Sequence, residues 1–457
     1  MKKSLKAAAL LLSLSMFLTA CGSTTNEETP EATDEAKTND AAADEGAADD
    51  DAAADTSSDE KITLTLWHQS VGETDPSAKI LSELITQWNE EHPNVQIEED
   101  GVTGEQYKTK IKTALAGGEA PDLFYMWGGS FVQPYIKADN ILAIDDYISD
   151  EVVSAMLPGT VDAVTVDGKI YSLPCYTHIA SLYCNTELFE QAGVAIPTTY
   201  AELLDAAKAL KAAGITPAVL GEKDRWPGMY WFDIIAMREV GNEAAVAAMK
   251  DPSKFNTPEF IEAARKAQEL VDAGLFNESM FSMSYDEMLG AFNQGAAAMM
   301  YQANWIHAGI EADSSAVKGK ITPVTFPVFE GAKGTKSEIF GGGIDSYYVN
   351  SATQHPQEAV EFLSFFSENL GRQGYLAGAG LPCWNTDDLD TSVLTDLDQE
   401  VASIMSEATS FVTWWDNILP ADSSETHKNL IADLFAKNIT PEEFCLEMSK
   451  IAPSEIE

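Results

Sequence analysis

Basic residues are scarce in this chain of 457 residues. Lys and Arg together number 28 against 73 Asp and Glu, which leaves a formal net charge of -45. A charge of this size repels the phosphates of nucleic acids and anionic membrane surfaces. We therefore expect no nucleic-acid partner, and expect partners that are neutral or cationic. About 45% of the residues are hydrophobic, so large cores can form, and the length suggests two or three domains.

Cysteine is also rare, with five residues in the whole chain. None of them shows the Cys-x-x-Cys spacing of structural zinc sites, so we expect no metal site. Four cysteines follow the first one, which allows three pairings, and the sequence does not choose among them. We expect free cysteines or at most one disulfide. These four residues are Cys175, Cys184, Cys383 and Cys445.

Two motifs of hydrolytic enzymes are missing. The sequence contains no Gly-x-Ser-x-Gly nucleophile elbow and no His-Glu-x-x-His pair. A glycine-rich stretch over 331–337 has the wrong spacing for a phosphate-binding loop, and 388–399 lacks the glycine and the final glutamate of a calcium loop. We expect no bound cofactor.

The first twenty residues have the pattern of a signal peptide. Three lysines precede an apolar run over 7–18, which is too short to span a bilayer comfortably as a helix. Small residues then lead to Cys21, and this segment resembles the lipobox of bacterial lipoproteins. The resemblance implies a diacylglycerol on the Cys21 thiol, and two acyl chains anchor a protein more firmly than one. We expect an extracytoplasmic protein, held at the bacterial cell membrane by this anchor only.

A low-complexity segment follows the cysteine. Residues 22–60 hold fourteen acids, one base and no aromatic residue. Such a composition does not bury enough apolar area to offset the entropy of ordering. We expect a disordered acidic linker over 21–60, with the folded part beginning near Lys61.

The folded part alternates between two hydrophobic periodicities. Period-two patterns predict strands, and patterns of about 3.6 residues predict helices, which together indicate an α/β protein. Expected strands lie at 62–66, 95–97, 122–126, 169–173, 180–183, 297–301, 324–328 and 346–349. Expected helices include 80–88, 107–115, 200–213, 258–273, 285–294, 356–367 and 424–435. The pattern is too long for one compact core, so two lobes joined by chain crossings are expected.

Seven segments in order resemble one family. They are 64–68 (LTLWH), 88–95 (WNEEHPNV), 115–123 (LAGGEAPDL), 167–174 (DGKIYSLP), 183–189 (YCNTELF), 292–300 (FNQGAAAMM) and 341–345 (GGGID). Each motif is weak alone, but their order and spacing resemble the extracellular solute-binding proteins of the family 1 sugar-receptor type. That family serves ATP-driven (ABC) importers, so the implied partners are the transmembrane subunits of such an importer.

The resemblance implies a fold and a division of the chain. The fold is the α/β two-lobe periplasmic-binding-protein fold (type II-like), with a ligand cleft between the lobes and a three-segment hinge. Carried onto this chain, lobe 1 is 61–173 plus 340–381, and lobe 2 is 174–339 plus 382–450. The crossings then lie near 173–174, 340–341 and 381–382. We also expect a monomer.

The candidate binding residues are chiefly aromatic. A sugar offers apolar C–H faces and a rim of hydroxyls, so flat aromatic side chains suit it. The chain has nine tryptophans, several of them beside Gly or Pro, as is common in loops, where functional residues concentrate. Trp88 lies on the apolar face of a helix and is assigned to the core. The candidates are Trp127, Trp226, Trp231, Trp305, Trp384 and Trp415, with Trp414 beside the last as a further possibility.

Four polar residues complete the expected site. Asp345 follows three glycines, and its carboxylate can accept hydrogen bonds from two sugar hydroxyls. His178 follows the first crossing. His68 and Gln69 end the first strand, and open α/β sheets bind ligands beyond the carboxyl ends of their strands.

These features together favour a lipoprotein that captures a mono- or oligosaccharide and delivers it to an ABC importer, rather than an enzyme. A secreted carbohydrate-active enzyme is the main alternative, because 73 acids can contain a pair about 5–10 Å apart. A binding lipoprotein for a non-sugar solute is the other alternative.

Overall fold

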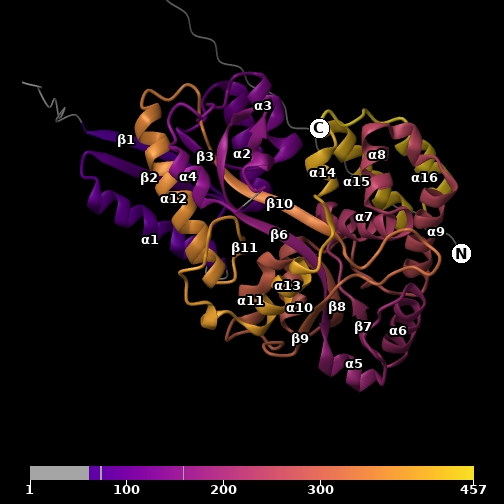
Figure 1. Cartoon of the computed structure of the whole chain (residues 1–457). Coiled ribbons are helices and arrows are strands. Elements are labelled where there is room, and N and C mark those ends of the chain that lie inside the picture. The colour runs from indigo at the N-terminus through magenta and orange to yellow at the C-terminus, as the bar shows by residue number, and fades with distance from the viewer. Residues whose placement is uncertain (1–60, 73–74, 158, 457) are drawn as a thin grey trace, which may run out of the picture. The chain divides into compact units, whose positions relative to one another are not determined.

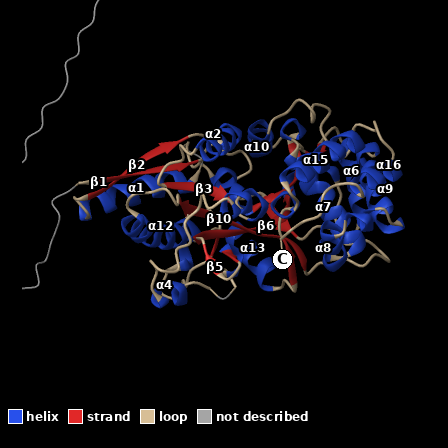
Figure 2. Cartoon of the chain, turned by 90° about the horizontal axis from the view of Figure 1, so that it is seen from above, coloured by secondary structure: helices blue, strands red, loops and turns tan. Residues whose placement is uncertain are grey.

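The computed structural model describes residues 61–72, 75–157 and 159–456. The signal peptide, Cys21 and the acidic linker therefore lie outside the described residues. Within the described part the chain is a mixed α/β protein, as expected, and helices flank the strands in Figure 2. None of the described helices is both long and apolar enough to cross a membrane.

The N-terminal part alternates strands and helices. Leu64 and Leu66 point into the core from β1 while Thr63 and Thr65 do not, which is why the alternating segment pairs as a half-buried strand. The elements are β1 (Ile62–His68), α1 (Pro76–Glu91), β2 (Val95–Gly101), α2 (Gly104–Gly117), β3 (Leu123–Trp127), η1 (Gly129–Phe131), α3 (Gln133–Lys137), α4 (Asp150–Ala155), β4 (Thr165–Val166) and β5 (Lys169–Ile170).

The middle of the chain begins with the longest strand and is rich in helices. Its elements are β6 (Ser172–Asn185), α5 (Thr186–Ala192), α6 (Tyr200–Ala212), β7 (Thr216–Ala218), η3 (Glu222–Asp224), α7 (Trp226–Val240), α8 (Asn242–Lys250), α9 (Pro258–Asp272), α10 (Tyr285–Asn293), β8 (Ala297–Ala303), α11 (His307–Glu311) and β9 (Ile321–Val324). Helix α7 is buried on nearly all sides.

The C-terminal part returns to the first sheet and then leaves it. Its elements are β10 (Glu338–Val349), α12 (Pro356–Leu376), β11 (Leu381–Pro382), α13 (Asp396–Ser406), β12 (Ser410–Val412), α14 (Trp415–Ile418), α15 (Ala421–Phe435) and α16 (Pro441–Met448). Helix α12 runs nine residues beyond the expected end at Ser367, because apolar residues continue to face the sheet as far as Leu370.

The strands join in the order β2-β1-β3-β10-β6-β8-β7. Strands β1, β2 and β3 are parallel, β10 is antiparallel to β3 and to β6, and β6 is antiparallel to β8. Figure 1 shows β6 and β10 running side by side through the middle of the molecule. Short β11 adds to β6, and short β12 adds to β10.

Two large hydrophobic cores lie at opposite ends of these long strands. Core 1 contains β1–β3, α1 and α12, and core 2 contains α7, α9, α15 and α16. Strand β6 gives Leu173 to core 1 and Leu182 to core 2, while β10 gives Tyr348 to core 1 and Phe340 to core 2. We call the elements around each core lobe 1 and lobe 2. Trp384, just beyond β11, still packs in core 1.

Two local expectations were wrong. The strand expected at 324–328 is instead β9 (Ile321–Val324), because its pairing with β6 ends at Val324 and Pro327 interrupts the pattern that follows. Trp226 was expected in a loop because Pro-Gly follows it, but it is the first residue of α7. Proline is well tolerated in the first turn of a helix, so Pro227 begins the helix here.

The four described cysteines are all buried and free. Burial raises the pKa of each thiol, because the thiolate is poorly solvated inside the protein. The described residues contain no group of three or more His, Cys, Asp or Glu side chains placed to hold a metal ion.

Candidate functional site

Asp345 is the polar centre of the candidate site. Strand β10 lies between β3 and β6, which sets Asp345 opposite Trp127 on one side and Tyr176 on the other. The Tyr125 hydroxyl donates to Asp345 Oδ1 over 2.8 Å, and His178 Nε2 lies 3.2 Å from Asp345 Oδ2. Tyr125 and His178 are buried, whereas 31% of the Asp345 side chain is exposed. Tyr125 and His178 therefore hold the Asp345 carboxylate in place, and part of it remains accessible to a ligand.

The Tyr125 hydroxyl is a permanent donor in this arrangement. Burial raises its pKa well above the ordinary value, and the nearby Asp345 carboxylate raises it further. Both influences disfavour the phenolate, so the hydroxyl keeps its proton at any physiological pH. Asp345 accordingly retains lone pairs for a ligand while Tyr125 holds its orientation.

The glycines before Asp345 bring an indole close to the strand. A Cβ on Gly343 would lie 2.1 Å from Trp414 Nε1, so only glycine leaves room for that ring. Gly342 has φ of 84°, a conformation that favours glycine, and the β6–β10 register shifts between Gly341 and Gly343. The glycine run thus fits the bulged strand under Trp414.

An aromatic wall lies beside the Asp345 centre. Trp305 meets His178 nearly at right angles, with ring centroids 5.1 Å apart, and its Nε1 donates to the Tyr285 hydroxyl over 2.7 Å. Trp226 packs on Tyr285 at 4.5 Å. Trp226 and Trp305 are only partly buried, so each keeps some exposed ring surface. The aromatic wall consists of Trp226, Tyr230, Tyr285, Trp305 and Trp414.

Trp127 supplies an aromatic surface from lobe 1. It ends β3, packs edge-on against Tyr125 at 5.2 Å and is partly buried. The Lys108 ammonium lies 5.2 Å from the centre of its ring. The site therefore joins Trp127 and Asp345 of lobe 1 to the aromatic wall of lobe 2 through His178 on β6.

Three predicted tryptophans are core residues. Trp231 and Trp384 are each 1% exposed, and Trp415 is fully buried. Trp231 packs on Phe326 and Phe276, while Trp384 Nε1 donates to the Pro174 carbonyl over 2.7 Å. A ring enclosed on all sides has no face for a ligand, so we correct these three assignments. The sequence around these tryptophans did not reveal which way their side chains point.

His68 ends β1 and Gln69 follows it, as expected, and within the described residues neither forms a hydrogen bond or ion pair with Asp345. His68 is 3% exposed and lies 3.2 Å from Glu99 Oε2. The close approach of the His68 ring lowers the pKa of the Glu99 carboxyl. His68 is thus engaged within lobe 1, while Gln69 is partly exposed.

Sequence reasoning missed Tyr125, Tyr230 and Tyr285. Tyr125 stands in an apolar strand run, Tyr230 in an apolar helix and Tyr285 at a helix start, so each matched an ordinary core or helix pattern. Their roles depend on contacts between segments far apart in the chain, for which one sequence gives no signal.

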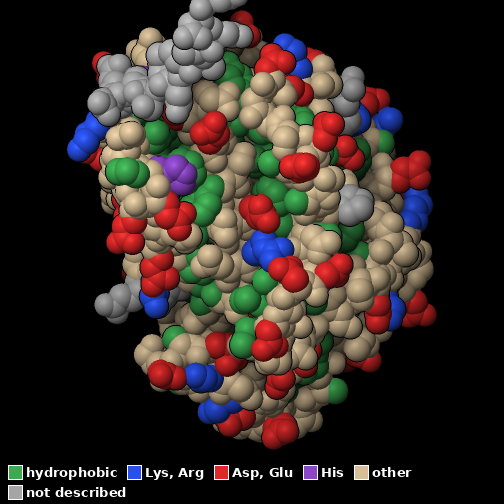
Figure 3. Space-filling model, turned by 60° about the vertical axis from the view of Figure 1, so that its left-hand side comes forward, with side chains coloured by type: hydrophobic (Ala, Val, Ile, Leu, Met, Phe, Trp, Pro, Cys, Tyr) green, Lys and Arg blue, Asp and Glu red, His purple; other side chains and the backbone are tan. Residues whose placement is uncertain are grey.

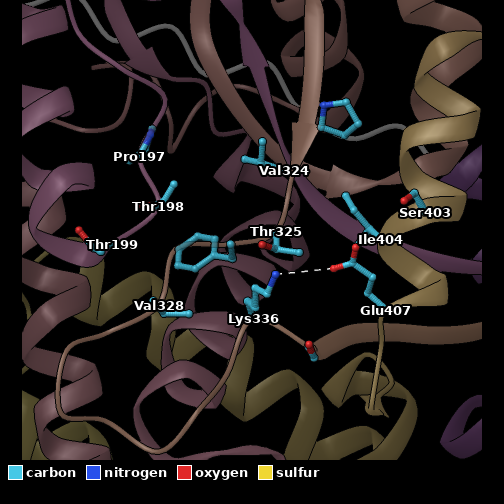
Figure 4. Close-up of a pocket in the computed structure, with 13 residues that line it drawn as sticks. Pro197, Thr198, Thr199, Val324, Thr325, Val328, Lys336, Ser403, Ile404 and Glu407 are labelled. Atoms are coloured by element: carbon cyan, nitrogen blue, oxygen red, sulfur yellow. Dashed lines mark ion pairs between the residues drawn. The ribbon is translucent and has the colours of Figure 1, made fainter.

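A separate cavity of about 550 Å³ lies away from these residues (Figure 4). Its walls come from the approach to α6, the segment around β9 and helix α13. Lys336 and Glu407 pair across it at 3.7 Å, and both side chains are mostly exposed. None of the sequence-predicted site residues lines it.

The negative charge does not single out a site. On the face shown in Figure 3, carboxylate side chains lie scattered among other groups rather than gathered in one patch. The charge of -45 also includes the fourteen acids of 22–60. The negative charge is spread over the sequence and does not mark a binding site. The aromatic contacts and hydrogen bonds around Asp345 identify the candidate site instead.

Comparison with known proteins gives consistent matches. A protein solved in work on xylan utilization by the thermophilic bacterium Caldanaerobius polysaccharolyticus superposes with a TM-score of 0.82 at 42% identity, covering 85% of this chain and 99% of that one. A chitin oligosaccharide binding protein superposes with a TM-score of 0.76 at 25% identity, covering 85% and 98%. The multiple sugar-binding protein of Streptococcus mutans is 23% identical over 71% of this chain and 76% of its own length.

The family model described as "Bacterial extracellular solute-binding protein" matches residues 72–369. This range contains both long strands, β6 and β10, and all of the Asp345 contacts described above. The chain belongs to the bacterial extracellular solute-binding protein family.

Proposed function

We propose that this protein captures an oligosaccharide outside the cytoplasm and delivers it to an ABC importer. The observation that carries the proposal is the accessible Asp345 carboxylate, held by Tyr125 and His178 beside partly exposed tryptophans. A carboxylate binds neighbouring hydroxyls, and aromatic rings cover the apolar face of a sugar. The aromatic rings that make up most of the remaining site favour the apolar faces of a sugar.

The choice of an oligosaccharide draws on the relatives. The similar protein at 42% identity comes from work on xylan utilization, and another similar structure is a chitin oligosaccharide binding protein. Aromatic surfaces lie on both sides of Asp345, Trp127 in lobe 1 and Trp305 in lobe 2, which suits more than one sugar ring. Xylo-oligosaccharides are therefore the first ligands to test.

Calorimetric titration tests this proposal. Xylo-, chito- and malto-oligosaccharides of two to four units serve as probes, with an equal concentration of a free amino acid mixture as the control. We expect saturable heat with at least one sugar series and none with the amino acids. Heat from the amino acids alone would assign the site to a non-sugar solute.

The function includes closure of two lobes about a hinge. We propose lobes of 61–173 plus 340–381 and of 174–339 plus 382–450. The division of β6 and β10 between the two cores supports two lobes, although Phe340 packs in core 2 and Trp384 in core 1. A ligand that contacts both lobes favours the state in which they meet, by its differential affinity for that state. The closed monomer would then be the form that the importer recognises.

We infer binding rather than catalysis, and the match to a solute-binding protein family and to a chitin oligosaccharide binding protein supports this inference. Asp345 accepts from Tyr125 and lies beside His178, an arrangement that orients it for hydrogen bonding. Incubation with the oligosaccharide that binds, followed by assay of new reducing ends, tests this part. Release of reducing ends above that of an Asp345→Ala variant would assign an enzyme instead.

Membrane attachment rests on Cys21, which lies outside the described residues. The lipobox-like segment supports acylation of this cysteine after cleavage of 1–20. The variant Cys21→Ser should leave the membrane fraction for the medium, whereas the parent chain should stay. Equal retention of both would exclude the anchor.

A further inference from the structure

Two segments from different lobes touch beside the candidate site. In lobe 1, η1 begins two residues after Trp127, and the neighbouring Val132 packs into core 1. In lobe 2, α14 follows Trp414 directly and packs into core 2 through Trp415. The chain therefore continues from an aromatic residue of the site into this contact on both sides.

The contact between η1 and α14 is close and specific. The Ser130 hydroxyl donates to the Asp416 carbonyl over 2.6 Å. A Cβ built on Gly129 would lie 2.1 Å from the Asn417 carbonyl oxygen, so a glycine is required there for the two backbones to approach. Asp416 is 9% exposed and Asn417 is 7% exposed, which means that the contact excludes most water.

Burial raises the pKa of the Asp416 carboxyl at this contact, and the charges of Lys428 and then of Lys108 on α2 offset part of that effect. Lys137 at the end of α3 also pairs with Glu455 near the C-terminus. That pair is largely exposed, so we assign it little energy.

We propose that Gly129 and Ser130 of lobe 1, with Asp416 and Asn417 of lobe 2, form a latch that holds the lobes together over the sugar. The latch rests on the proposed function, since it acts on the affinity for the sugar through the closed state. Trp127 precedes the lobe 1 part of the latch, and Trp414 precedes the lobe 2 part. The movement that closes the latch therefore also brings these two aromatic residues together around the sugar. Gly129 and Ser130 are positioning residues in this proposal, because neither needs to touch the sugar.

Gly129→Ala gives the sharpest test. Gly129 has φ of 61°, so the substitution also strains the backbone, and Gly118→Ala is the matched control because Gly118 has φ of 70° and no atom within 4 Å of an added Cβ. Calorimetric titration with the tightest-binding oligosaccharide should show at least about tenfold weaker binding for Gly129→Ala than for Gly118→Ala. Both variants should show a cooperative melting transition.

Ser130→Ala tests the hydrogen bond alone. We expect roughly two- to tenfold weaker binding, since a single neutral hydrogen bond contributes about that much. Ser154→Ala is its control, because the Ser154 hydroxyl donates within its own helix, to the Glu151 carbonyl. Equal affinities within each variant-control pair would overturn the latch while leaving the sugar site intact.

A cross-linking experiment examines the latch without any sugar. The double variant Ser130→Cys/Asn417→Cys is oxidised mildly so that a disulfide forms between the two positions where they touch, and the two single variants are the controls. We expect an intramolecular cross-link, found by mass spectrometry as one peptide joining the two positions. Failure to cross-link would overturn the latch, whereas the absence of sugar binding by the parent chain would overturn only the proposed function.

Discussion

At the scale of single residues, the site depends on side chains fixed by neighbours from distant parts of the chain. Asp345 receives its two contacts from Tyr125, more than two hundred positions earlier, and from His178 on a different strand. Each contact removes rotational freedom from the carboxylate before a ligand arrives. Preorganisation of this kind lowers the entropy lost on binding.

Replacing Asp345 by Asn tests the charge of this residue. Asn keeps the shape but gives up one acceptor oxygen and the negative charge. Hydrogen bonds to charged groups contribute about 1.5–3 kcal/mol, so we expect sugar binding to weaken by roughly ten- to hundredfold. Calorimetry measures the affinity, and Asp145→Asn, outside the site, is the control. Unfolding of the Asp345→Asn variant would instead show that the carboxylate is needed for the fold.

Trp305 and Trp231 form an informative pair of substitutions. Trp305 is partly exposed, so Trp305→Ala should weaken sugar binding by about 1–3 kcal/mol and leave the protein folded. Trp231 is 1% exposed, so Trp231→Ala should instead lower the free energy of unfolding by about 3–5 kcal/mol. Titration and chemical denaturation of both variants measure the two quantities. The reverse pattern would exchange the roles of the two tryptophans.

Two residues predicted from the sequence, His178 and Trp305, lie together with Asp345 in the structure. The tryptophan assignments were less successful, because the neighbouring sequence does not show whether an indole points outward or into a core. Trp384 points inward to the Pro174 carbonyl, a partner more than two hundred positions away.

At the scale of elements, the start of α7 holds an unusual buried acid. Glu222 of η3 is fully buried, and a Cβ on Gly228 would lie 2.0 Å from its Oε2, so its carboxyl packs on the first turn of α7. Burial raises its pKa to about 8, and the charge of Arg225 offsets only part of this effect. Because α7 begins with Trp226, the acid supports one side of the aromatic wall.

This acid makes stability depend on pH. A folded-state pKa above the ordinary value of 4.5 means that the folded protein binds the proton more tightly. The stabilisation from Glu222 is therefore complete below pH 4.5 and is lost as the pH rises toward about 8. Denaturation of Glu222→Gln and the parent chain at several pH values should show the parent losing a few kcal/mol relative to the variant over this window, at roughly 1.4 kcal/mol per pH unit.

The control for this experiment is Glu90→Gln, an exposed position on α1. Its stability should follow that of the parent chain at every pH. A Glu222→Gln variant that also follows the parent chain would show that Glu222 does not titrate in this window.

Periodicity predicted most of the elements, and its errors have physical causes. Helices such as α6 and α9 have one apolar face and clear N-caps at Thr199 and Thr257, so their patterns stand out. Helix α7 is apolar on every side because it is enclosed within core 2, which removes the helical period from its sequence. Strand β10 was expected only from Ser346, since its glycine run has no hydrophobic pattern.

At the scale of the whole molecule, closure should be measurable in solution. Binding between two lobes draws them together, so the radius of gyration from small-angle scattering should decrease when the sugar saturates the protein. The comparison uses one protein sample with and without the sugar. A radius that stays constant on saturation would indicate a rigid receptor.

The two-lobe fold was predictable because it came from a resemblance carried by seven short motifs, whereas composition alone indicated only two or three domains. Where the lobes touch was not predictable. Gly129 approaches the Asn417 backbone closely, which only a glycine allows. In the sequence this glycine, after Trp127, matched an ordinary loop.

The pairing of β6 with β10 has a consequence for how this protein folds. Strand β10 pairs with β6, for example Tyr348 with Ser172, and contributes residues to both cores. Both cores therefore need β10, which is synthesised after most of lobe 2. Contacts between segments so far apart in sequence slow folding, because the chain loses loop entropy before the contacts form. A nascent chain shorter than about 350 residues thus lacks the strand that completes either core, so neither core is complete until β10 has been synthesised.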